Sequence, residues 1–349
     1  MKNIGIFYAV AAAALFGAST PFAKLLLGTM PPVLLAAVLY LGSGIGLLAV
    51  RLHQSSTRNN NEAALPRSQW PWLAGAVLFG GALGPVLLMI GLKSTSAAAS
   101  SLLLNFEGVF TALLAWFVFR ENFDWRIALG MVAIVTGGTV LSWQPQGGFA
   151  LSIGALAVVA ACACWGVDNN LTQKVSASDP FQIASIKGLV AGSVNLVIAL
   201  ALGASLPSFR VLVGALVVGF FGYGLSLACF VLALRHIGTA RTGAYFSLAP
   251  FVGTLVSLLL LHESMQRTFW IAALLMGAGV WLHLTERHGH EHQHEHLEHS
   301  HRHVHDEHHQ HQHAIGVDPG EPHTHPHTHE PITHSHAHFP DIHHRHEHV

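Results

Sequence analysis

Charged residues are scarce in this sequence. Asp, Glu, Lys and Arg make up 10% of the 349 residues, whereas hydrophobic residues make up 51%. A soluble globular protein carries about 25% charged residues. The composition therefore argues against a soluble protein and favours one that spans a membrane.

Cysteine is also scarce, and nucleotide-binding or catalytic motifs are missing. Cys162, Cys164 and Cys229 all fall inside apolar runs, so no extracellular disulfide framework is available and we interpret them as small packed residues. The sequence has no phosphate-binding loop and no nucleophile–base arrangement. We therefore expect no enzymatic activity, no catalytic residue, no required cofactor and no nucleic-acid partner.

Long apolar runs follow one another up to about residue 285. A helix of around 20 apolar residues crosses a bilayer core. Ten such runs are predicted, near 4–27, 31–51, 70–92, 96–119, 125–143, 151–171, 182–203, 209–234, 240–261 and 267–285. The first resembles a secretory signal, but it continues through Pro21 to Leu27, and we expect a retained helix. The predicted fold is an all-α polytopic membrane protein with a tail.

The distribution of Lys and Arg predicts the orientation. With a cytoplasmic N-terminus, eleven basic residues near helix ends, among them Lys187 and Arg235, fall inside and four, among them Lys24, fall outside. Ten spans then place the C-terminal tail in the cytoplasm. The expected location is the inner (plasma) membrane, with the lipid bilayer as partner and the oligomeric state open.

The sequence looks doubled. "FGASTPFAK" from Phe16 is echoed by "WGVDNNLTQK" from Trp165, and the sequence shift that places Lys93 on Arg235 also places Glu121 on Glu263. Five spans per half is an odd number, so the halves insert in opposite orientations, as in many transporters with a site at the repeat interface. The predicted units are 1–143, 151–285 and a tail over 286–349.

These features are similar to those of one transporter superfamily. The ten short spans, the "FG" and "WG" starts and "LAPFVGTLVSLLLLHE" (248–263) resemble the EamA-type drug/metabolite transporter superfamily over residues 1 to about 285. The resemblance implies export of a solute such as an amino acid, a metabolite or a drug. The chain departs from the pattern where Glu107-Gly108 stands at the position of Ala249-Pro250.

Glu107 lies near mid-membrane in the run "LLLNFEGVFTALLAWFVF". An ionised group there costs a few kcal/mol on insertion scales. At helical spacing Glu107 shares a face with Ser100, Leu104 and Thr111. Two interpretations are open: a neutral carboxyl bonded to a neighbouring helix, or a carboxylate that binds protons or cations. We favour the second and include Thr111 in the transport site.

A second polar cluster is "CWGVDNNLTQ" (164–173). Cys164, Asp168 and Thr172 follow at four-residue intervals on one helical face, and Asn169 and Asn170 widen it. Asp168 is interpreted as hydrated at the interface, as a cytoplasmic entrance for a cation, or as the partner of a basic residue.

Two other groups are expected to have ordinary roles. Lys24 should extend to the membrane surface. Glu121 and Glu263 should pair at the surface beside Arg120 and Arg267.

The tail from His288 to Val349 holds all but four of the 28 histidines in the chain. It has few apolar residues and five prolines, so we expect disorder. Imidazole suits Zn, Cu, Ni and Fe, and the absence of cysteine makes a Cu(I) specialist less favoured. A pH-responsive polycation is the competing interpretation. The candidate metal ligands are His288, His290, His292, His294, His296, His299, His301, His303, His305, His308, His309, His311, His313, His323, His325, His327, His329, His334, His336 and His338.

The membrane part and the tail together suggest a function. The first hypothesis is efflux of a divalent transition metal, Ni²⁺ or Co²⁺ with Zn²⁺ possible, driven by proton exchange at Glu107 and fed by ions gathered on the tail. Some nickel and cobalt resistance transporters carry similar tails. The alternatives are an amino-acid or metabolite exporter whose tail only buffers metal, and a membrane metal store or sensor.

Overall fold

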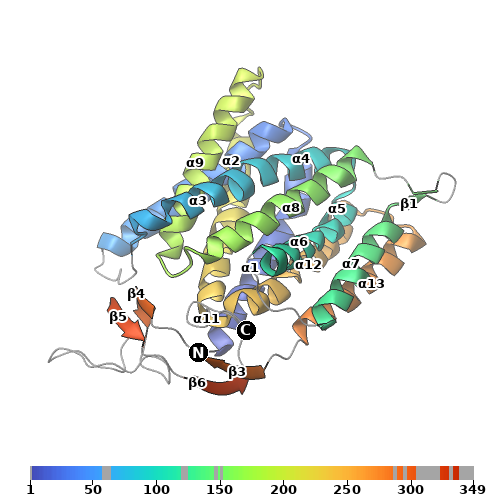
Figure 1. Ribbon diagram of the computed structural model, residues 1–349. Coiled ribbons are helices and arrows are strands. Elements are labelled where there is room, and N and C mark those ends of the chain that lie inside the picture. The colour runs from blue at the N-terminus through green and yellow to red at the C-terminus, as the bar shows by residue number, and fades with distance from the viewer. Residues whose placement is uncertain are drawn as a thin grey trace.

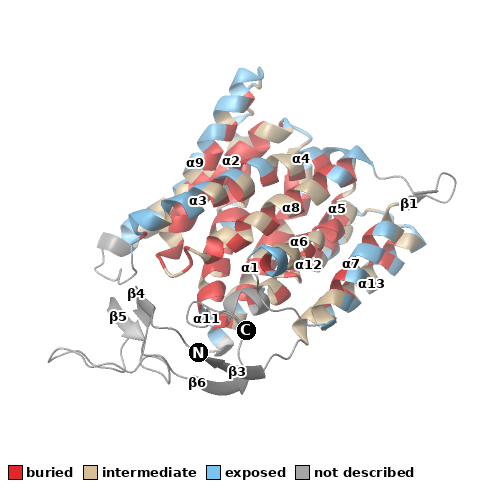
Figure 2. Ribbon diagram, in the orientation of Figure 1, coloured by how far each residue is buried: buried red, intermediate tan, exposed pale blue. Residues whose placement is uncertain are grey.

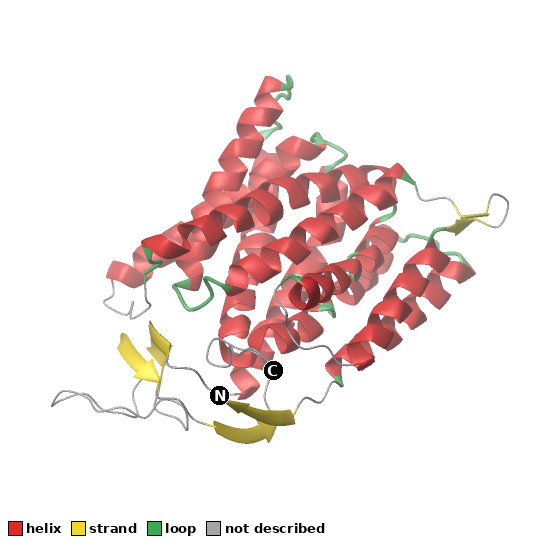
Figure 3. Cartoon of the chain, viewed as in Figure 1, coloured by secondary structure: helices red, strands yellow, loops and turns green. Residues whose placement is uncertain are grey.

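A computed structural model describes residues 2–56, 64–118, 125–144, 148–149 and 152–285, and four short segments of the tail. The chain is a bundle of helices (Figures 1 and 3). The helices of the first half are α1 (Lys2–Leu26), α2 (Pro32–Ser56), η1 (Arg67–Gln69), α3 (Trp70–Ala76), η2 (Val77–Leu83), α4 (Gly84–Ser94), α5 (Ala97–Leu103), α6 (Phe106–Phe117) and α7 (Trp125–Leu141).

The second half has a similar order of helices. Its helices are α8 (Ile153–Gln173), α9 (Pro180–Ala201), α10 (Phe209–Gly219), η3 (Phe220–Leu225), α11 (Ser226–Phe246), α12 (Ala249–Leu261) and α13 (Arg267–Leu284). The single helix α11 stands here in the place of α4 and α5. Two short antiparallel strands, β1 (Trp143–Gln144) and β2 (Gly148–Phe149), lie between the halves.

Within the described residues nine helical segments are long and apolar enough to cross a membrane, and α7 is a shorter apolar helix of 17 residues. These ten segments correspond to the ten predicted runs. Large apolar side chains such as Phe7, Val197 and Leu274 are exposed on the outside of the bundle, where Figure 2 shows much of the exposed surface. In a bilayer this surface faces lipid, so its exposure is expected.

Residues at the helix starts explain several boundaries. Ser96 and Ser152 accept hydrogen bonds from the N–H groups of Ala99 and Ala155, so they cap α5 and α8. Asp179 caps α9 in the same way, and Pro180 follows it at a position where a missing N–H costs nothing. At the other end of α12, His262 has a left-handed backbone conformation (φ 51°) that ends the helix.

The two halves pack as a pseudo-symmetric pair. α1 packs against α11 and α12, and its counterpart α8 packs against α4 and α6, while α2 pairs with α9 and α7 with α13. Glycines permit the corresponding crossings: Gly17 lies against the backbone of Ala249, and Gly166 lies against Phe110. Close backbone approach at small residues is how membrane helices associate.

Corresponding irregularities strengthen this symmetry. The third span of each half contains a π-helix, which begins at Val77 in η2 and at Phe220 in η3. The fourth span of the first half is broken before Phe106, and the matching break lies before Ala249. The separation in sequence between Val77 and Phe220 equals the separation between Phe106 and Ala249. π-Helices and broken membrane helices occur frequently at functional sites.

The structure contradicts the sequence interpretation of Glu263 and gives Lys24 specific partners. The Lys24 Nζ donates to the carbonyl oxygens of Leu92 (2.5 Å) and Thr95 (2.7 Å), so it binds the end of α4 instead of extending freely. The Glu263 carboxylate accepts the N–H groups of Ala97 (2.8 Å) and Ala98 (2.9 Å), so it caps α5 from a distant part of the sequence. The two charges complement the dipoles of these helix ends. Glu121 lies outside the described residues.

Of the tail, the backbone of β3 (Gly289–Gln293), β4 (Leu297–His303), β5 (His323–His329) and β6 (Thr333–Ala337) is described. β3 pairs antiparallel with β6, and β4 with β5. An isolated two-stranded ribbon is at best marginally stable in water, so these pairs do not make a folded domain. The predicted ligands outside the described residues are His288, His294, His296, His305, His308, His309, His311, His313 and His338.

Candidate functional site

A pocket lies among helices of both halves, with about 440 Å³ of space that includes its open part. Its polar lining includes Glu107, Asp168, Asn169 and Lys187. Its aromatic lining is Phe16, Tyr40, Trp165, Tyr223, Phe230 and Phe246.

Glu107 lines the pocket just after a turn that interrupts the fourth span. α5 ends at Leu103 and α6 begins at Phe106, so Glu107 stands in the first turn of a new helix rather than in the middle of a long one. The N-terminal end of a helix carries partial positive charge, which favours a carboxylate there. Glu107 is buried, at 9% relative exposure. In the matching helix α12 the second residue is Pro250, so the structure pairs Glu107 with Pro250. The sequence comparison pairs Glu107 with Ala249, which is one residue off.

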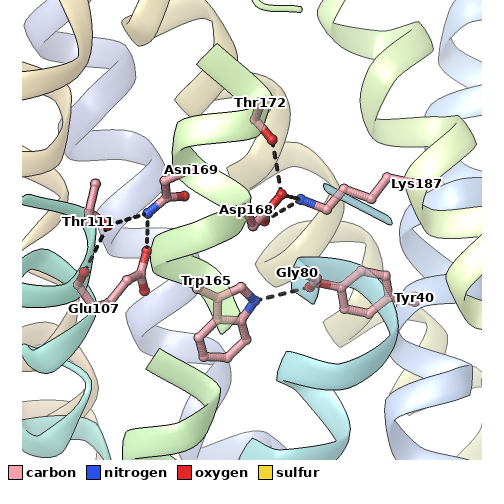
Figure 4. Close-up of polar contacts among 9 residues, drawn as sticks. All are labelled: Tyr40, Gly80, Glu107, Thr111, Trp165, Asp168, Asn169, Thr172 and Lys187. Carbon is pink, nitrogen blue, oxygen red and sulfur yellow. Dashed lines mark hydrogen bonds and ion pairs between the residues drawn. The ribbon is translucent and has the colours of Figure 1, made fainter. Parts of the chain in front are cut away.

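Glu107 is joined to the second half of the chain by α8. The Asn169 side-chain amide donates to the Glu107 Oε1 at 2.8 Å and to the Thr111 Oγ1 at 3.2 Å (Figure 4). The Thr111 hydroxyl donates to the Glu107 carbonyl oxygen at 2.8 Å. In the part of the chain that the structure describes, no basic side chain forms an ion pair with Glu107.

Asp168 is in a different electrostatic position. The Lys187 ammonium on α9 donates to both carboxylate oxygens of Asp168, and Thr172 adds a hydrogen bond of 3.0 Å (Figure 4). The Asp168 and Lys187 side chains are 6% and 2% exposed. A buried pair of opposite charges neutralises itself. Asp168 therefore has the basic partner that one of the sequence interpretations expected, and its side chain is buried.

The carbonyl oxygen of Gly80 connects two of the aromatic walls. It accepts the Tyr40 hydroxyl at 2.6 Å and the Trp165 indole N–H at 3.0 Å. A π-helix widens the turn, and Gly80 lies within the π-helix η2. The ring of Phe16 contacts those of Trp165 and Tyr223, with centroids 5.6 and 5.7 Å apart.

The remaining predicted residues have supporting positions. Asn170 donates to the carbonyl oxygens of Gly166 (2.9 Å) and Thr111 (3.2 Å), so it joins α8 to α6. Cys164 is half-buried and does not line the pocket. Ser100 is separated from Glu107 by the turn at Leu104 and Asn105, and its hydroxyl bonds to that of Thr95 at 2.6 Å.

Sequence reasoning missed Lys187, which was assigned to the set of basic residues near cytoplasmic helix ends. The structure places it 1% exposed within α9. Its position inside an apolar run was the available signal, because an ammonium there needs a partner. Arg235, assigned to the same set, is also buried and donates to the carbonyl oxygens of Ser176 (3.4 Å) and Ser178 (2.8 Å).

The described residues of the membrane part do not bring metal ligands together. Among the described residues, no group of three or more His, Cys, Asp or Glu side chains is placed to hold a metal ion. Of the tail histidines, the structure describes at most the backbone.

Comparison with known proteins decides the family. A profile of the EamA-like transporter family matches the chain twice, over residues 3–143 and 152–285. The chain belongs to the EamA-like transporter family. It is therefore a multi-pass membrane protein of a transporter family and sits in a lipid bilayer.

Individual relatives agree with this family. The chain is 31% identical over 290 residues to an uncharacterized transporter of Methanothermobacter thermautotrophicus, covering 78% of this chain and 84% of the relative. It is 37% identical over 118 residues to a probable 4-amino-4-deoxy-L-arabinose-phosphoundecaprenol flippase subunit ArnE of Pseudomonas paraeruginosa, covering 33% of this chain and 99% of the relative. A protein crystal structure shares the fold with a TM-score of 0.61 at 18% identity, covering 80% of this chain and 95% of the other.

Proposed function

We propose that this EamA-family transporter exports a cation in exchange for protons at Glu107. The observation that carries the proposal is the contrast between its two buried carboxylates. Asp168 is neutralised by Lys187, whereas Glu107 has an amide neighbour and no ion pair among the described residues. Burial favours the neutral form of Glu107, and an arriving cation favours the ionised form. Release of a proton and binding of a cation are thereby linked.

The pocket supports an organic cation as the cargo best. Aromatic rings of Phe16, Tyr40, Trp165 and Tyr223 surround a space that has one carboxylate free for pairing. Aromatic faces attract ammonium groups, and their area binds an apolar body. The name of the ArnE relative contains an amino sugar, which is consistent with an amine-bearing cargo.

The histidine-rich tail favours a second cargo, a divalent transition-metal ion such as Ni²⁺ or Co²⁺, with Zn²⁺ possible. A tail beside a cytoplasmic entrance would raise the local concentration of the ion. The described part of the pocket offers this ion few protein ligands, since Glu107 is its one unpaired carboxylate and no three-residue metal cluster is present there. Water would complete the coordination. With an organic cargo the tail would act as a metal buffer, and without transport the protein would be a metal store or sensor.

Proton flux in proteoliposomes separates these possibilities. Full-length protein and a variant ending at residue 287 are reconstituted with a pH-sensitive dye inside, and choline, benzyltrimethylammonium, Ni²⁺, Co²⁺ or Zn²⁺ is added outside. We expect a quaternary ammonium ion to move protons in both forms. Flux driven by metal ions alone would favour the second cargo. If none of these cations moves protons, cation–proton exchange is wrong.

A further inference from the structure

The two π-helices of the pocket differ at one equivalent position. Gly80 is the fourth residue of η2 and Tyr223 is the fourth residue of η3, so the two residues correspond. Tyr223 fills its position with a ring that lines the pocket. Gly80 has no side chain, and the side chain of a neighbouring residue occupies the space where one would lie.

The space at Gly80 is occupied by the carboxylate of Asp168. A Cβ added at Gly80 would overlap the side chain of Asp168, including its Oδ2, Cγ and Cβ atoms. Lys187 forms an ion pair with the same carboxylate. A side chain at position 80 would therefore push Asp168 out of its place beside Lys187.

The same residue also positions two aromatic walls. The Gly80 carbonyl oxygen accepts both the Tyr40 hydroxyl from α2 and the Trp165 N–H from α8. One residue thus contacts Asp168, Tyr40 and Trp165, which all line the pocket (Figure 4). These groups lie on helices from both halves of the chain.

We propose that Gly80 is a positioning residue of the transport site, which sets the Asp168–Lys187 pair and the aromatic walls in the arrangement that binds the cargo cation. The proposal rests on the proposed cation transport for its functional consequence. Gly80 itself need not touch the cargo. Its role is to keep Asp168 neutralised, so that Glu107 remains the one carboxylate of the pocket available to a cation, and to orient the rings around it.

The test compares Gly80→Ala with Gly91→Ala. Gly91 lies in the same span and also faces α8, but a Cβ there meets Val158 and the backbone of Gly154, away from the pocket. Both variants overpack an interface, so both should lose stability. In benzyltrimethylammonium-driven proton flux, we expect Gly80→Ala to raise the half-saturating concentration at least about tenfold, and Gly91→Ala to leave it unchanged.

A second pair of variants, each lacking only one hydroxyl group, keeps the test valid if Gly80→Ala does not fold. Tyr40→Phe removes one donor to the Gly80 carbonyl, and we expect the half-saturating concentration to rise about two- to tenfold, as for the loss of a neutral hydrogen bond. Tyr245→Phe is the control, because Tyr245 lies outside the pocket lining. Unchanged half-saturation in both Gly80→Ala and Tyr40→Phe would overturn the positioning role.

A readout without cargo separates this proposal from the proposed function. The fluorescence of Trp165 is obtained as the difference between each protein and its Trp165→Phe counterpart. We expect Gly80→Ala to shift this difference spectrum and Gly91→Ala to leave it as in the unmodified protein. If the Gly80→Ala spectrum shifts but the unmodified protein shows no cation-driven flux, the transport proposal is contradicted and the positioning role of Gly80 still holds. An unshifted spectrum would overturn the positioning itself.

Discussion

Lys187 on α9 donates hydrogen bonds to both carboxylate oxygens of Asp168 on α8, and the pair is buried inside the membrane-spanning bundle. Nineteen residues separate the two in the sequence. The pair removes Asp168 from the groups available to a cation. Of the two acidic side chains that line the pocket, Glu107 is therefore the one left to exchange protons with cargo.

Breaking this pair should be more costly than removing both of its members. Lys187→Met leaves a buried carboxylate without its counter-charge, so we expect a loss of about 3–5 kcal/mol in unfolding free energy. Adding Asp168→Asn should recover most of that loss, because no unpaired charge remains. Thermal unfolding in detergent measures both.

The Arg51–Asp179 pair provides a control for this prediction. The Arg51 side chain is 31% exposed, and the Asp179 carboxylate, although only 3% exposed, also accepts the N–H groups of Phe181 and Gln182, so Arg51→Met should cost less than Lys187→Met. Equal losses for Arg51→Met and Lys187→Met would show that the buried pair does not have the energetic role assigned here.

Glu263 should stabilise the turn between α4 and α5. Glu263→Ala removes two charge-assisted hydrogen bonds to the N–H groups of Ala97 and Ala98, which leaves the start of α5 uncapped there. We expect a loss of about 2–4 kcal/mol in unfolding free energy. Gln266→Ala, at an exposed position in the same loop, should change the stability little. A Glu263→Ala protein as stable as this control would contradict the capping role.

The tail should bind metal without supporting the fold. Removal of residues 288–349 should leave the helical part inserted, with an unfolding temperature close to that of the full chain, because the tail has few apolar residues with which to contribute to a core. Equilibrium dialysis should find several Ni²⁺ or Zn²⁺ ions per full chain and few per truncated chain.

Equal metal stoichiometry in the two forms would rule out the tail as the metal-binding element. A reporter fused after Val349 should also lie in the cytoplasm. A C-terminus on the other side would mean that the tail cannot gather cytosolic ions.

The sequence predicted the number of spans well because hydrophobic length alone decides which segments cross a bilayer. The pattern of apolar runs did not indicate the break between Leu103 and Phe106, although Asn105, a polar residue of low helix propensity, stands there. A continuous helix therefore placed Ser100 and Glu107 on one face, whereas the structure gives them different partners.

Individual residues of the site could be predicted from the sequence, but the hydrogen bonds and the ion pair that join them could not. Glu107, Asp168 and Asn169 were identified because polar groups in apolar runs need partners. Which partner each takes depends on helices that meet only in the folded bundle. Lys187 was therefore assigned to topology, and the contribution of Gly80 has no sequence signal, because it consists of a missing side chain beside Asp168.

The central claim is that Glu107 couples proton and cation movement. Glu107→Gln keeps the shape and the hydrogen-bonding capacity of the side chain but cannot ionise, whereas Glu107→Asp keeps the charge. In proteoliposomes with an imposed pH gradient, proton flux driven by benzyltrimethylammonium or by Ni²⁺ is the measurement that tests the claim. The account predicts that Glu107→Gln abolishes this flux, that Glu107→Asp retains part of it, and that both proteins insert normally. Flux in Glu107→Gln equal to that of the unmodified protein would contradict it.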